Sequence, residues 1–198
     1  MPQQFYKFTR EERSCIACGF CSYGVDCPNP SDCIGCGACY TACPANAIKP
    51  VPDHEPRRYV KVFVDGVEYL VPEKITIKRA LEILGMGPSP IPEKNYACSP
   101  CSTGGCYACE VEVNGEYKRA CLTKVEDGMR IELKRGSGYV PRRIVHGPSP
   151  HSVGGVGTPY WLKGYRYVEV AIWVAGCNLR CPQCQNWEVT YDSKSEPL

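Results

Sequence analysis

The sequence contains little phenylalanine, has a net charge close to zero and lacks long hydrophobic runs. Only 4 of its 198 residues are Phe, so we expect several small hydrophobic clusters and not one large core. Its 23 basic and 21 acidic residues give a net charge of +2, which disfavours nucleic acid or a membrane surface as the partner. The longest apolar run, Val168 to Gly176, contains Glu169, and the first residues, Met1-Pro2-Gln3-Gln4, have neither the basic nor the apolar region of a signal peptide. We therefore expect a soluble, cytoplasmic protein.

Cysteine, in contrast, is abundant. The chain has 16 cysteines, and thiols in a reducing cytosol are not normally paired in structural disulfides, so ligation of metal is the leading explanation. They fall into three groups, within residues 15–43, 98–121 and 177–184. The stretches Lys49–Arg58 and Arg135–Lys163 between the groups are rich in proline or in glycine and proline. Both are predicted to be linkers between separately ligated modules.

The first group of cysteines is an internal repeat. Three cysteines at two-residue spacing recur at an offset of 18, and each run ends in Cys-Pro. Such a triplet wraps one corner of a cubane cluster, and the fourth thiolate must come from elsewhere. The pattern resembles the bacterial ferredoxins that hold two [4Fe-4S] clusters. A pair of zinc sites is the alternative, since zinc also takes four cysteines.

The ferredoxin resemblance implies that each run supplies the fourth ligand of the other cluster. One [4Fe-4S] cluster would then be held by Cys15, Cys18, Cys21 and Cys43, and the second by Cys27, Cys33, Cys36 and Cys39. This sequence has five residues between Cys21 and Cys27 where the family has three. We expect the two additional residues to change the surroundings of the second cluster without removing a ligand.

The second group lies in a stretch with the pattern of a small β-rich module. Alternating apolar and polar residues around Asp-Gly and Asn-Gly pairs predict two tight hairpins, and apolar residues at helical spacing after a capping threonine predict one short helix. The predicted elements are a hairpin at Tyr59–Pro72 turned by Asp65-Gly66, a helix at Thr76–Leu84 stopped by Gly85, a hairpin at Glu110–Cys121 turned by Asn114-Gly115, and a strand at Met129–Leu133.

The order of hairpin, helix, cysteine loop, hairpin and strand is similar to that of the β-grasp ferredoxins, which hold [2Fe-2S] clusters. The loop has the plant-type cysteine spacing, and its distance to the last cysteine resembles that in the iron–sulfur subunits of molybdenum hydroxylases. The resemblance assigns the cluster to Cys101, Cys106, Cys109 and Cys121. Cys98 is then a buried or free thiol. It also completes a credible four-cysteine zinc pattern with Cys101, Cys106 and Cys109, which stays open as an alternative.

The third group follows an apolar, β-branched run at Val168–Ala175, which predicts a buried strand. Its cysteines, Cys177, Cys181 and Cys184, supply only three ligands. In an iron–sulfur cluster this leaves one iron open to a substrate or cofactor. The alternative is a zinc site with a distant fourth ligand, such as His146 or His151.

The phrase GCNLRCPQCQNWE resembles the radical S-adenosylmethionine enzymes, in particular the branch related to pyruvate formate-lyase activating enzymes. The resemblance implies a [4Fe-4S] cluster on Cys177, Cys181 and Cys184 whose open iron is chelated by S-adenosyl-L-methionine. One electron from the cluster would cleave the sulfonium to give a 5′-deoxyadenosyl radical. The residue before the third cysteine is commonly aromatic in that family, and here it is Gln183.

The expected fold class is α+β with several modules. Residues 1–50 are the two-cluster ferredoxin-like module, 58–135 the β-grasp ferredoxin-like module, 136–163 a linker, and 164–198 the first strand and cluster loop of a partial (β/α) barrel. The family's barrel has six repeats, whereas this chain ends 14 residues after Cys184. It is therefore expected to be a fragment, to be completed by another chain or segment, or to carry a vestigial site.

Two functions follow from these patterns. In the first, the chain is the N-terminal part of a radical S-adenosylmethionine enzyme, and its ferredoxin-like modules relay electrons to the cluster that binds the cofactor. In the second, it is a non-catalytic, multi-cluster electron-transfer adaptor. Both functions require a redox partner protein as electron donor. The 198-residue chain alone is expected to be inactive or incomplete as an enzyme.

Overall fold

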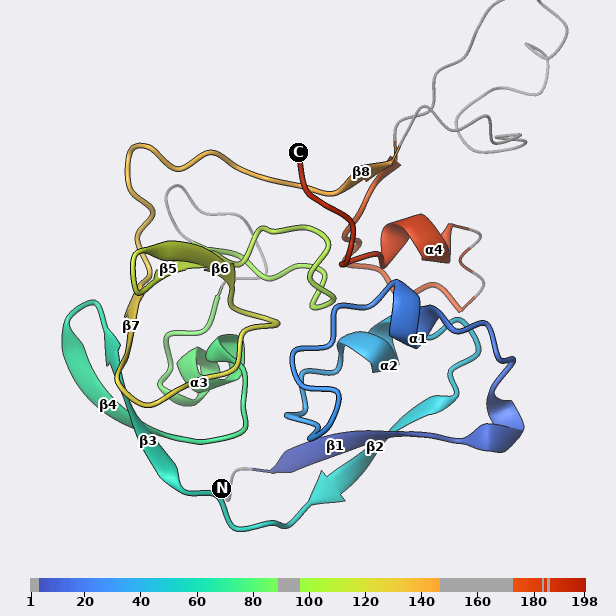
Figure 1. Cartoon of the computed structure of the whole chain (residues 1–198), viewed down its shortest axis with the longest axis horizontal. Helices are drawn as coiled ribbons and strands as arrows, with labels where there is room; N and C mark the ends of the chain where they lie inside the picture. The colour runs from blue at the N-terminus through green and yellow to red at the C-terminus, as the bar shows by residue number, and fades with distance from the viewer. Residues whose placement is uncertain (1–3, 89–96, 147–172, 183, 185) are drawn as a thin grey trace, which may run out of the picture.

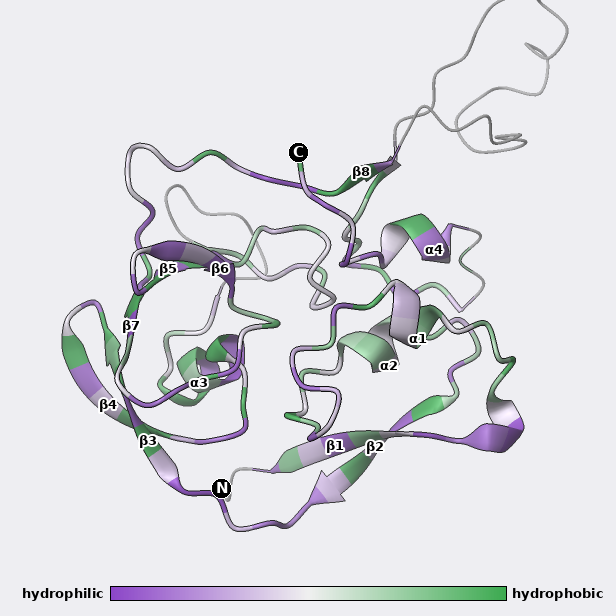
Figure 2. Ribbon diagram, viewed as in Figure 1, coloured by the Kyte–Doolittle hydropathy of each residue, from purple (hydrophilic) through white to green (hydrophobic). Residues whose placement is uncertain are grey.

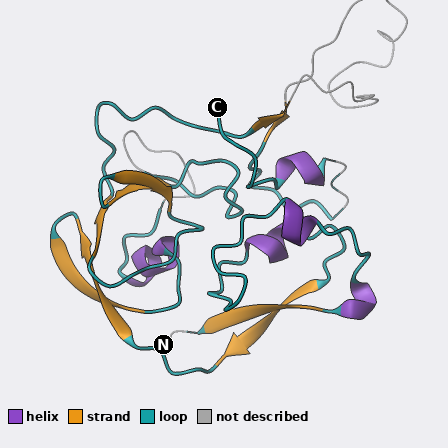
Figure 3. Ribbon diagram, in the orientation of Figure 1, coloured by secondary structure: helices purple, strands orange, loops and turns teal. Residues whose placement is uncertain are grey.

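The computed structural model describes residues 4–88, 97–146, 173–182, 184 and 186–198 (Figure 1). Loops connect short helices and short strands over much of this length (Figure 3). The elements are β1 (Phe5–Arg10), a 3-10 turn (Glu12–Ser14), α1 (Phe20–Tyr23), α2 (Ala38–Ala42), β2 (Ile48–Asp53), β3 (Tyr59–Val64), β4 (Val67–Pro72), α3 (Ile77–Ile83), β5 (Glu110–Val113), β6 (Glu116–Arg119), β7 (Met129–Glu132), β8 (Val145–His146), β9 (Trp173–Val174) and α4 (Trp187–Thr190). Across the described ranges, none of the helices has the length and apolar character needed to cross a membrane.

The sequence repeat of the first group is also a repeat of backbone conformation. α1 and α2 each begin after a glycine in the left-handed region, Gly19 and Gly37, both at a φ of +75°. Two residues earlier, Ala17 and Gly35 also have positive φ values of +53° and +72°. Gly19 and Gly37 are 18 positions apart, as are Ala17 and Gly35, and this is the offset at which the cysteines recur. The two triplets therefore wrap the chain in the same way.

A two-stranded antiparallel sheet joins the ends of this first module. β1 pairs with β2 from Phe5 opposite Asp53 to Arg10 opposite Ile48. The prediction of a linker at Lys49–Arg58 is therefore wrong for its first five residues. β2 accommodates Pro50 and Pro52 because only one of its two edges is paired. In a two-stranded sheet each strand is an edge strand, where proline is tolerated.

The second module is a five-stranded mixed sheet with the order β4-β3-β7-β5-β6. The two predicted hairpins are confirmed, β3 with β4 and β5 with β6, and their turns have the paired positive φ values of Asp65, Gly66, Asn114 and Gly115. β7 pairs parallel to β3 and antiparallel to β5, so it joins the hairpins into one sheet. Hydrophobic and hydrophilic residues alternate along β3 and β4 (Figure 2), as expected for a sheet with one covered face.

The predicted helix is confirmed as α3. The Thr76 side chain accepts a hydrogen bond from the backbone N–H of Arg79 at 3.2 Å, which satisfies one of the free amides of the first turn. Gly85 follows the helix at a φ of +75°, the left-handed conformation that ends many helices. Ile77, Ala80 and Leu81 are almost completely buried, so α3 covers the inner face of the sheet.

The expectation of several small clusters is wrong for most of the buried residues, although Tyr107, Ile144 and Ala175 form a separate small cluster. Buried residues of the first module, such as Phe20 and Ala38, belong to the same continuous cluster as Val62, Ile131 and the other core residues of the sheet. Cysteines are part of the reason, because Cys109 and Cys121 are members of this cluster and Cys18, Cys36 and Cys39 pack against it. A buried cysteine packs as a small hydrophobic residue. The low phenylalanine content therefore does not divide the core.

The C-terminal segment does not show the predicted partial barrel in its described part. Of the predicted strand Val168–Ala175, residues 168–172 lie outside the described residues. β9 pairs antiparallel with β8, Trp173 opposite His146 and Val174 opposite Val145, whereas barrel strands are parallel. The predicted linker 136–163 thus supplies a strand within its described residues, 136–146.

The segment around α4 lies beside α1, over the first module, and the chain reaches it from the sheet by way of β8 (Figure 1). Tyr191, Asp192 and Ser193 after α4 are buried. Backbone hydrogen bonds in both directions between Arg143 and Leu198 hold the C-terminal residue against the strand-forming part of the predicted linker. The described C-terminal residues therefore pack against both modules.

Candidate metal centres

The cysteines predicted to hold the first cluster line one cavity. This cavity, of about 200 Å³, is lined by Cys15, Cys18, Cys21 and Cys43 together with apolar residues such as Ile16 and Ile48. Cys43 comes from the second run of the repeat, so the structure brings together the crossed set and not four sequential cysteines. The backbone N–H of Ala47 donates to Cys43 Sγ at 3.2 Å, the kind of contact that tunes an iron–sulfur cluster. Four thiols around a mainly apolar cavity fit a [4Fe-4S] cluster.

The cysteines predicted for the second cluster also lie together. The pKa of Cys36 is raised to about 11, mainly by burial, with contributions from the neighbouring thiols of Cys27 and Cys33. Burial also raises the pKa of Cys39 to about 12, with contributions from Cys36, Cys33 and Cys27. Because these effects require proximity, Cys27 lies beside the second triplet despite the enlarged spacing before it. Thiols with raised pKa values deprotonate when a metal binds, which makes binding pH-dependent.

The four cysteines predicted for the [2Fe-2S] cluster are all buried, each with 4% or less of its surface exposed. They form two contacts: Cys106 Sγ lies 3.1 Å from Cys101 Sγ, and the N–H of Cys121 donates to Cys109 Sγ at 3.5 Å. Hydrogen bonds from the Cys106 thiol and from Thr103 lower the pKa of Cys101 to about 5. The same hydrogen bond raises the pKa of Cys106, and the hydrogen bond with Cys109 raises that of Cys121. Because the thiolate is the form that binds metal, cluster binding at this loop requires loss of protons from these thiols.

Cys98 differs from its neighbours. It is 4% exposed, its N–H donates to the carbonyl of Ala108 at 3.0 Å, and burial raises its pKa. These properties are typical of an inert, packed thiol. In the described part of the chain, no three Cys, His, Asp or Glu side chains converge on the position of one metal ion.

The third cysteine group surrounds one tyrosine. Burial raises the pKa of Tyr191, and the thiols of Cys184, Cys177 and Cys181 contribute in that order, so all three predicted ligands lie near this side chain. The N–H of Leu179 donates to Cys177 Sγ at 3.3 Å. Of the two histidines weighed as a fourth zinc ligand, His151 lies outside the described residues, and His146 Nε2 lies 2.9 Å from an oxygen of Asp192.

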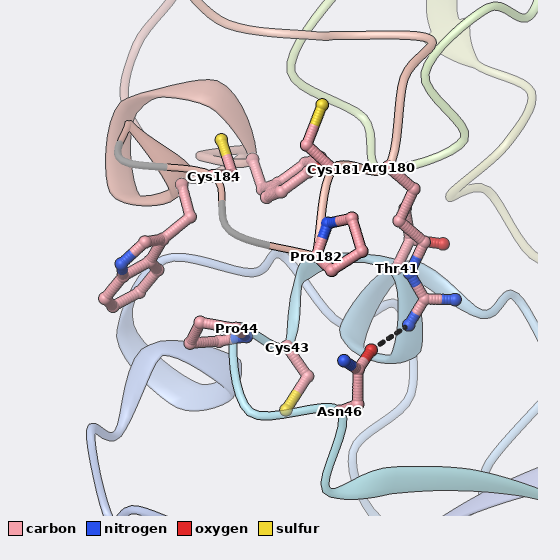
Figure 4. Close-up of a pocket in the computed structure, with 10 residues that line it drawn as sticks. Thr41, Cys43, Pro44, Asn46, Arg180, Cys181, Pro182 and Cys184 are labelled. Carbon is pink, nitrogen blue, oxygen red and sulfur yellow. Dashed lines mark hydrogen bonds between the residues drawn. The ribbon is translucent and has the colours of Figure 1, made fainter.

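A pocket of about 380 Å³ opens between the third group and the first module. Figure 4 shows Cys181, Pro182 and Cys184 on one side and Cys43, Pro44 and Asn46 on the other. Arg180, Trp187 and Tyr191 complete most of its lining. Directly before Cys177, the backbone of Gly176 packs so closely against Cys106 that no side chain fits there. The third group is therefore in contact with both ferredoxin-like modules.

Arg119, at the end of β6, connects the three cysteine groups. Its guanidinium donates to Asp26 Oδ2 at 2.5 Å, to the carbonyl of Ser193 at 2.9 Å and to the carbonyl of Gly104 at 3.2 Å. It also lies 4.6 Å from the centre of the Tyr107 ring. The sequence does not reveal the role of this residue, because its partners are 15, 74 and 93 residues away in the chain. The signal that the sequence offers is an arginine two residues before Cys121.

The five residues between Cys21 and Cys27 explain how the C-terminal segment is held. The carbonyl of Gly24 accepts a hydrogen bond from the N–H of Ser193 at 2.9 Å, and the N–H of Asp26 donates to Ser193 Oγ at 2.7 Å. The carbonyl of Ser22 accepts one from Lys194 Nζ. The enlarged spacing thus forms a contact surface for the C-terminal segment, and it leaves Cys27 beside its own cluster site.

Comparison with known proteins supports the two ferredoxin-like modules. Residues 57–136 match the model of the 2Fe-2S iron–sulfur cluster binding domain, and residues 27–49 match that of the 4Fe-4S binding domain. The chain carries iron–sulfur binding domains of both types. A relative from Methanocaldococcus jannaschii, also an iron–sulfur protein, is 40% identical over 95 residues, which cover 43% of this chain and 18% of the relative. Neither matched model includes the third cysteine group.

The crossed arrangement makes a prediction about Cys27. The variant Cys27→Ala should lose most of the signal of the second cluster, which the other three ligands, Cys33, Cys36 and Cys39, would hold. The signal of the first cluster should stay largely intact, because its cavity is lined by Cys43 and not by Cys27. Iron analysis and paramagnetic resonance of the reduced protein measure this. Cys98→Ala is the matched control, with all clusters retained. Loss of the first cluster in Cys27→Ala would instead support sequential ligation.

Proposed function

We propose that this chain is an electron-transfer protein in which two ferredoxin-like modules deliver electrons to a third iron–sulfur centre on Cys177, Cys181 and Cys184. In this proposal the first module, residues 1–50, holds two [4Fe-4S] clusters with the crossed ligands given above. The second module, residues 58–135, holds a [2Fe-2S] cluster on Cys101, Cys106, Cys109 and Cys121. A redox partner protein supplies the electrons.

The observation that carries the proposal is the position of the third group between the other two. Gly176, directly before Cys177, packs against Cys106 of the [2Fe-2S] loop. On the other side, Cys181 and Cys184 share a pocket with Cys43, a ligand of the first cluster. An electron carrier needs its centres close together, and the protein supplies that positioning. A separate, solvated C-terminal tail would have neither contact.

The same geometry favours a second candidate function, the reductive cleavage of S-adenosylmethionine at the third centre. A [4Fe-4S] cluster with three thiolate ligands has an open iron that can bind this cofactor and supply the electron that breaks its carbon–sulfur bond. The residues here support such binding in two respects. The three thiols lie around Tyr191, and beside them is a pocket of about 380 Å³ lined by polar residues, including Arg180 and Asn46, and by Trp187.

The experiment that separates the two functions uses the reconstituted 198-residue chain. An electron-transfer protein should show a third [4Fe-4S] centre by iron and sulfide analysis, which is lost in Cys181→Ala and retained in Cys98→Ala. If it also cleaves the cofactor, adding S-adenosylmethionine should shift the paramagnetic resonance of that centre and release 5′-deoxyadenosine, detected by chromatography. A third centre that responds to neither test supports the carrier alone. Equal cluster content in wild type and Cys181→Ala would contradict both functions.

A further inference from the structure

Two Cys-Pro dipeptides face each other across the pocket between the first module and the third cysteine group. Cys43-Pro44 follows directly after α2, and Cys181-Pro182 lies in the third group. All four residues line the same pocket (Figure 4). The contact therefore brings a predicted ligand of the first cluster and a predicted ligand of the third to opposite walls of one small space.

Cys43 is part of two cavities. It lines the cavity of about 200 Å³ that it shares with Cys15, Cys18 and Cys21, and also the pocket beside Cys181. Its sulfur points away from Cys181 and Cys184 (Figure 4) and accepts a hydrogen bond from the N–H of Ala47. Its side chain is thus directed to the first cluster site, while the peptide that continues into Pro44 forms a wall of the pocket.

Arg180 fastens the two sides together. Its guanidinium donates to the carbonyl of Tyr40 at 2.7 Å and to Asn46 Oδ1 at 3.1 Å, and it lies 3.9 Å from the centre of the Tyr40 ring. Tyr40 is in α2, three residues before Cys43, and Arg180 directly precedes Cys181. An arginine that makes a forked hydrogen bond and stacks on an aromatic ring fixes orientation as well as distance.

We propose that the contact between Cys43-Pro44 and Cys181-Pro182 is the path by which the third centre receives its electrons. Arg180 is the positioning residue that holds the two sides of this contact together. The inference rests on the proposed function. One electron leaves the reduced first cluster, which returns to its oxidised state, and enters the oxidised third cluster. No bond is made or broken in this step. The immediate donor is thus the first [4Fe-4S] cluster and not the [2Fe-2S] cluster.

A competing path runs from Cys106 through Gly176 to Cys177. The two paths differ in the residues that hold them. The hydrogen bonds and the ring contact of Arg180 join it to the first module, whereas Gly176 packs against the [2Fe-2S] loop. Loosening Arg180 therefore acts on one path alone. This separation makes the choice of donor measurable.

The test compares Arg180→Ala with wild type in the fully reconstituted chain, reduced photochemically by a deazaflavin as the one-electron donor. Freeze-quenched samples give the paramagnetic resonance signal of each cluster against time. In wild type we expect the third signal to rise together with the first and to be broadened by magnetic interaction with it. In Arg180→Ala we expect the broadening to be lost and the third signal to lag behind the other three, with iron content unchanged.

Arg180→Lys should recover part of the rate, since a lysine still donates one hydrogen bond to the Tyr40 carbonyl. Arg79→Ala is the matched control, because Arg79 pairs with Glu82 on α3 and should leave every signal as in wild type. If Arg180→Ala does not assemble its clusters, Asn46→Gly removes the hydrogen bond from Arg180 to Asn46 Oδ1 and leaves the contacts with Tyr40. Glycine suits the positive φ of +51° at that position.

The outcomes are distinct. A third centre that is reduced and broadened as in wild type in both Arg180→Ala and Asn46→Gly overturns the path and leaves the electron-transfer function standing. The path is also overturned, and the electron-transfer function kept, if the signal of the third centre follows that of the [2Fe-2S] cluster in every variant. A third centre that is absent from the wild-type protein, or that no electrons reach, overturns the proposed function and the path together.

Discussion

Removal of iron by a chelator should unfold the first module and leave the five-stranded sheet of the second module folded. α1 and α2 have four and five residues, far fewer than a helix needs to be stable alone. β1 and β2 form a sheet of only two strands, which is marginal in water. The four thiols of the first site come from both runs of the repeat, so ligated metal is the main element that holds these pieces together.

The second module contributes most of the buried residues of the shared core. Val62, Val111, Ile77 and Ile131 are completely buried between α3 and the sheet. Amide hydrogen exchange of the chelated 198-residue chain should therefore show fast exchange in β1 and β2 and retained protection in β3 and β7. Reconstitution with iron and sulfide should restore protection of β1, and zinc alone should not. Full protection of β1 and β2 in the iron-free protein would contradict this account.

Arg119→Ala should release the C-terminal segment from both modules. The substitution removes charged hydrogen bonds to Asp26, Ser193 and Gly104 and leaves two carbonyls without this donor. Each hydrogen bond to a charged group contributes about 1.5 to 3 kcal/mol, and because the three share one side chain we expect a loss of about 3 kcal/mol in total. The N–H of Ser193, which donates to Gly24, should then exchange roughly 100-fold faster.

Two other variants serve as controls for Arg119. Asp26→Asn should cost only about 1 kcal/mol, since the Asp26 side chain is 44% exposed and solvent screens its ion pair. Arg130→Ala removes an arginine of β7 that stacks on Phe63, and should cost less than about 1 kcal/mol without changing the exchange of Ser193. If Arg119→Ala leaves the exchange of Ser193 as in wild type, the three-way contact does not hold the segment.

The elements that sequence alone predicted well are those with local causes. The turn at Asp65-Gly66 follows from two adjacent residues that tolerate positive φ, and the start of α3 follows from the side chain of Thr76 and the amide of Arg79. The cysteine spacings indicated the cluster loops for the same reason, because each loop must wrap within a few residues. Such signals lie within a short stretch of chain and do not depend on the rest of the fold.

The features that sequence did not predict depend on contacts between distant residues. Lys49–Asp53 has the composition of a linker, and only its pairing with β1 makes it a strand. Arg119 and Arg180 look like ordinary surface arginines in the sequence, yet their partners are 93 and 140 residues away in the chain. The hydrophobic core is continuous because residues of two modules meet. No periodicity or motif within one module contains this information.

The close packing of Gly176 on Cys106, and of Gly105 on the backbone of Asp192, has a consequence for the maturation of the protein. Residues 173–198 are synthesised after both ferredoxin-like modules, and they then cover part of the [2Fe-2S] loop. A scaffold protein that delivers a preformed cluster needs access to that loop. We therefore expect the biogenesis of the centres to be ordered in time, with the [2Fe-2S] cluster inserted before the nascent C-terminal segment settles over it.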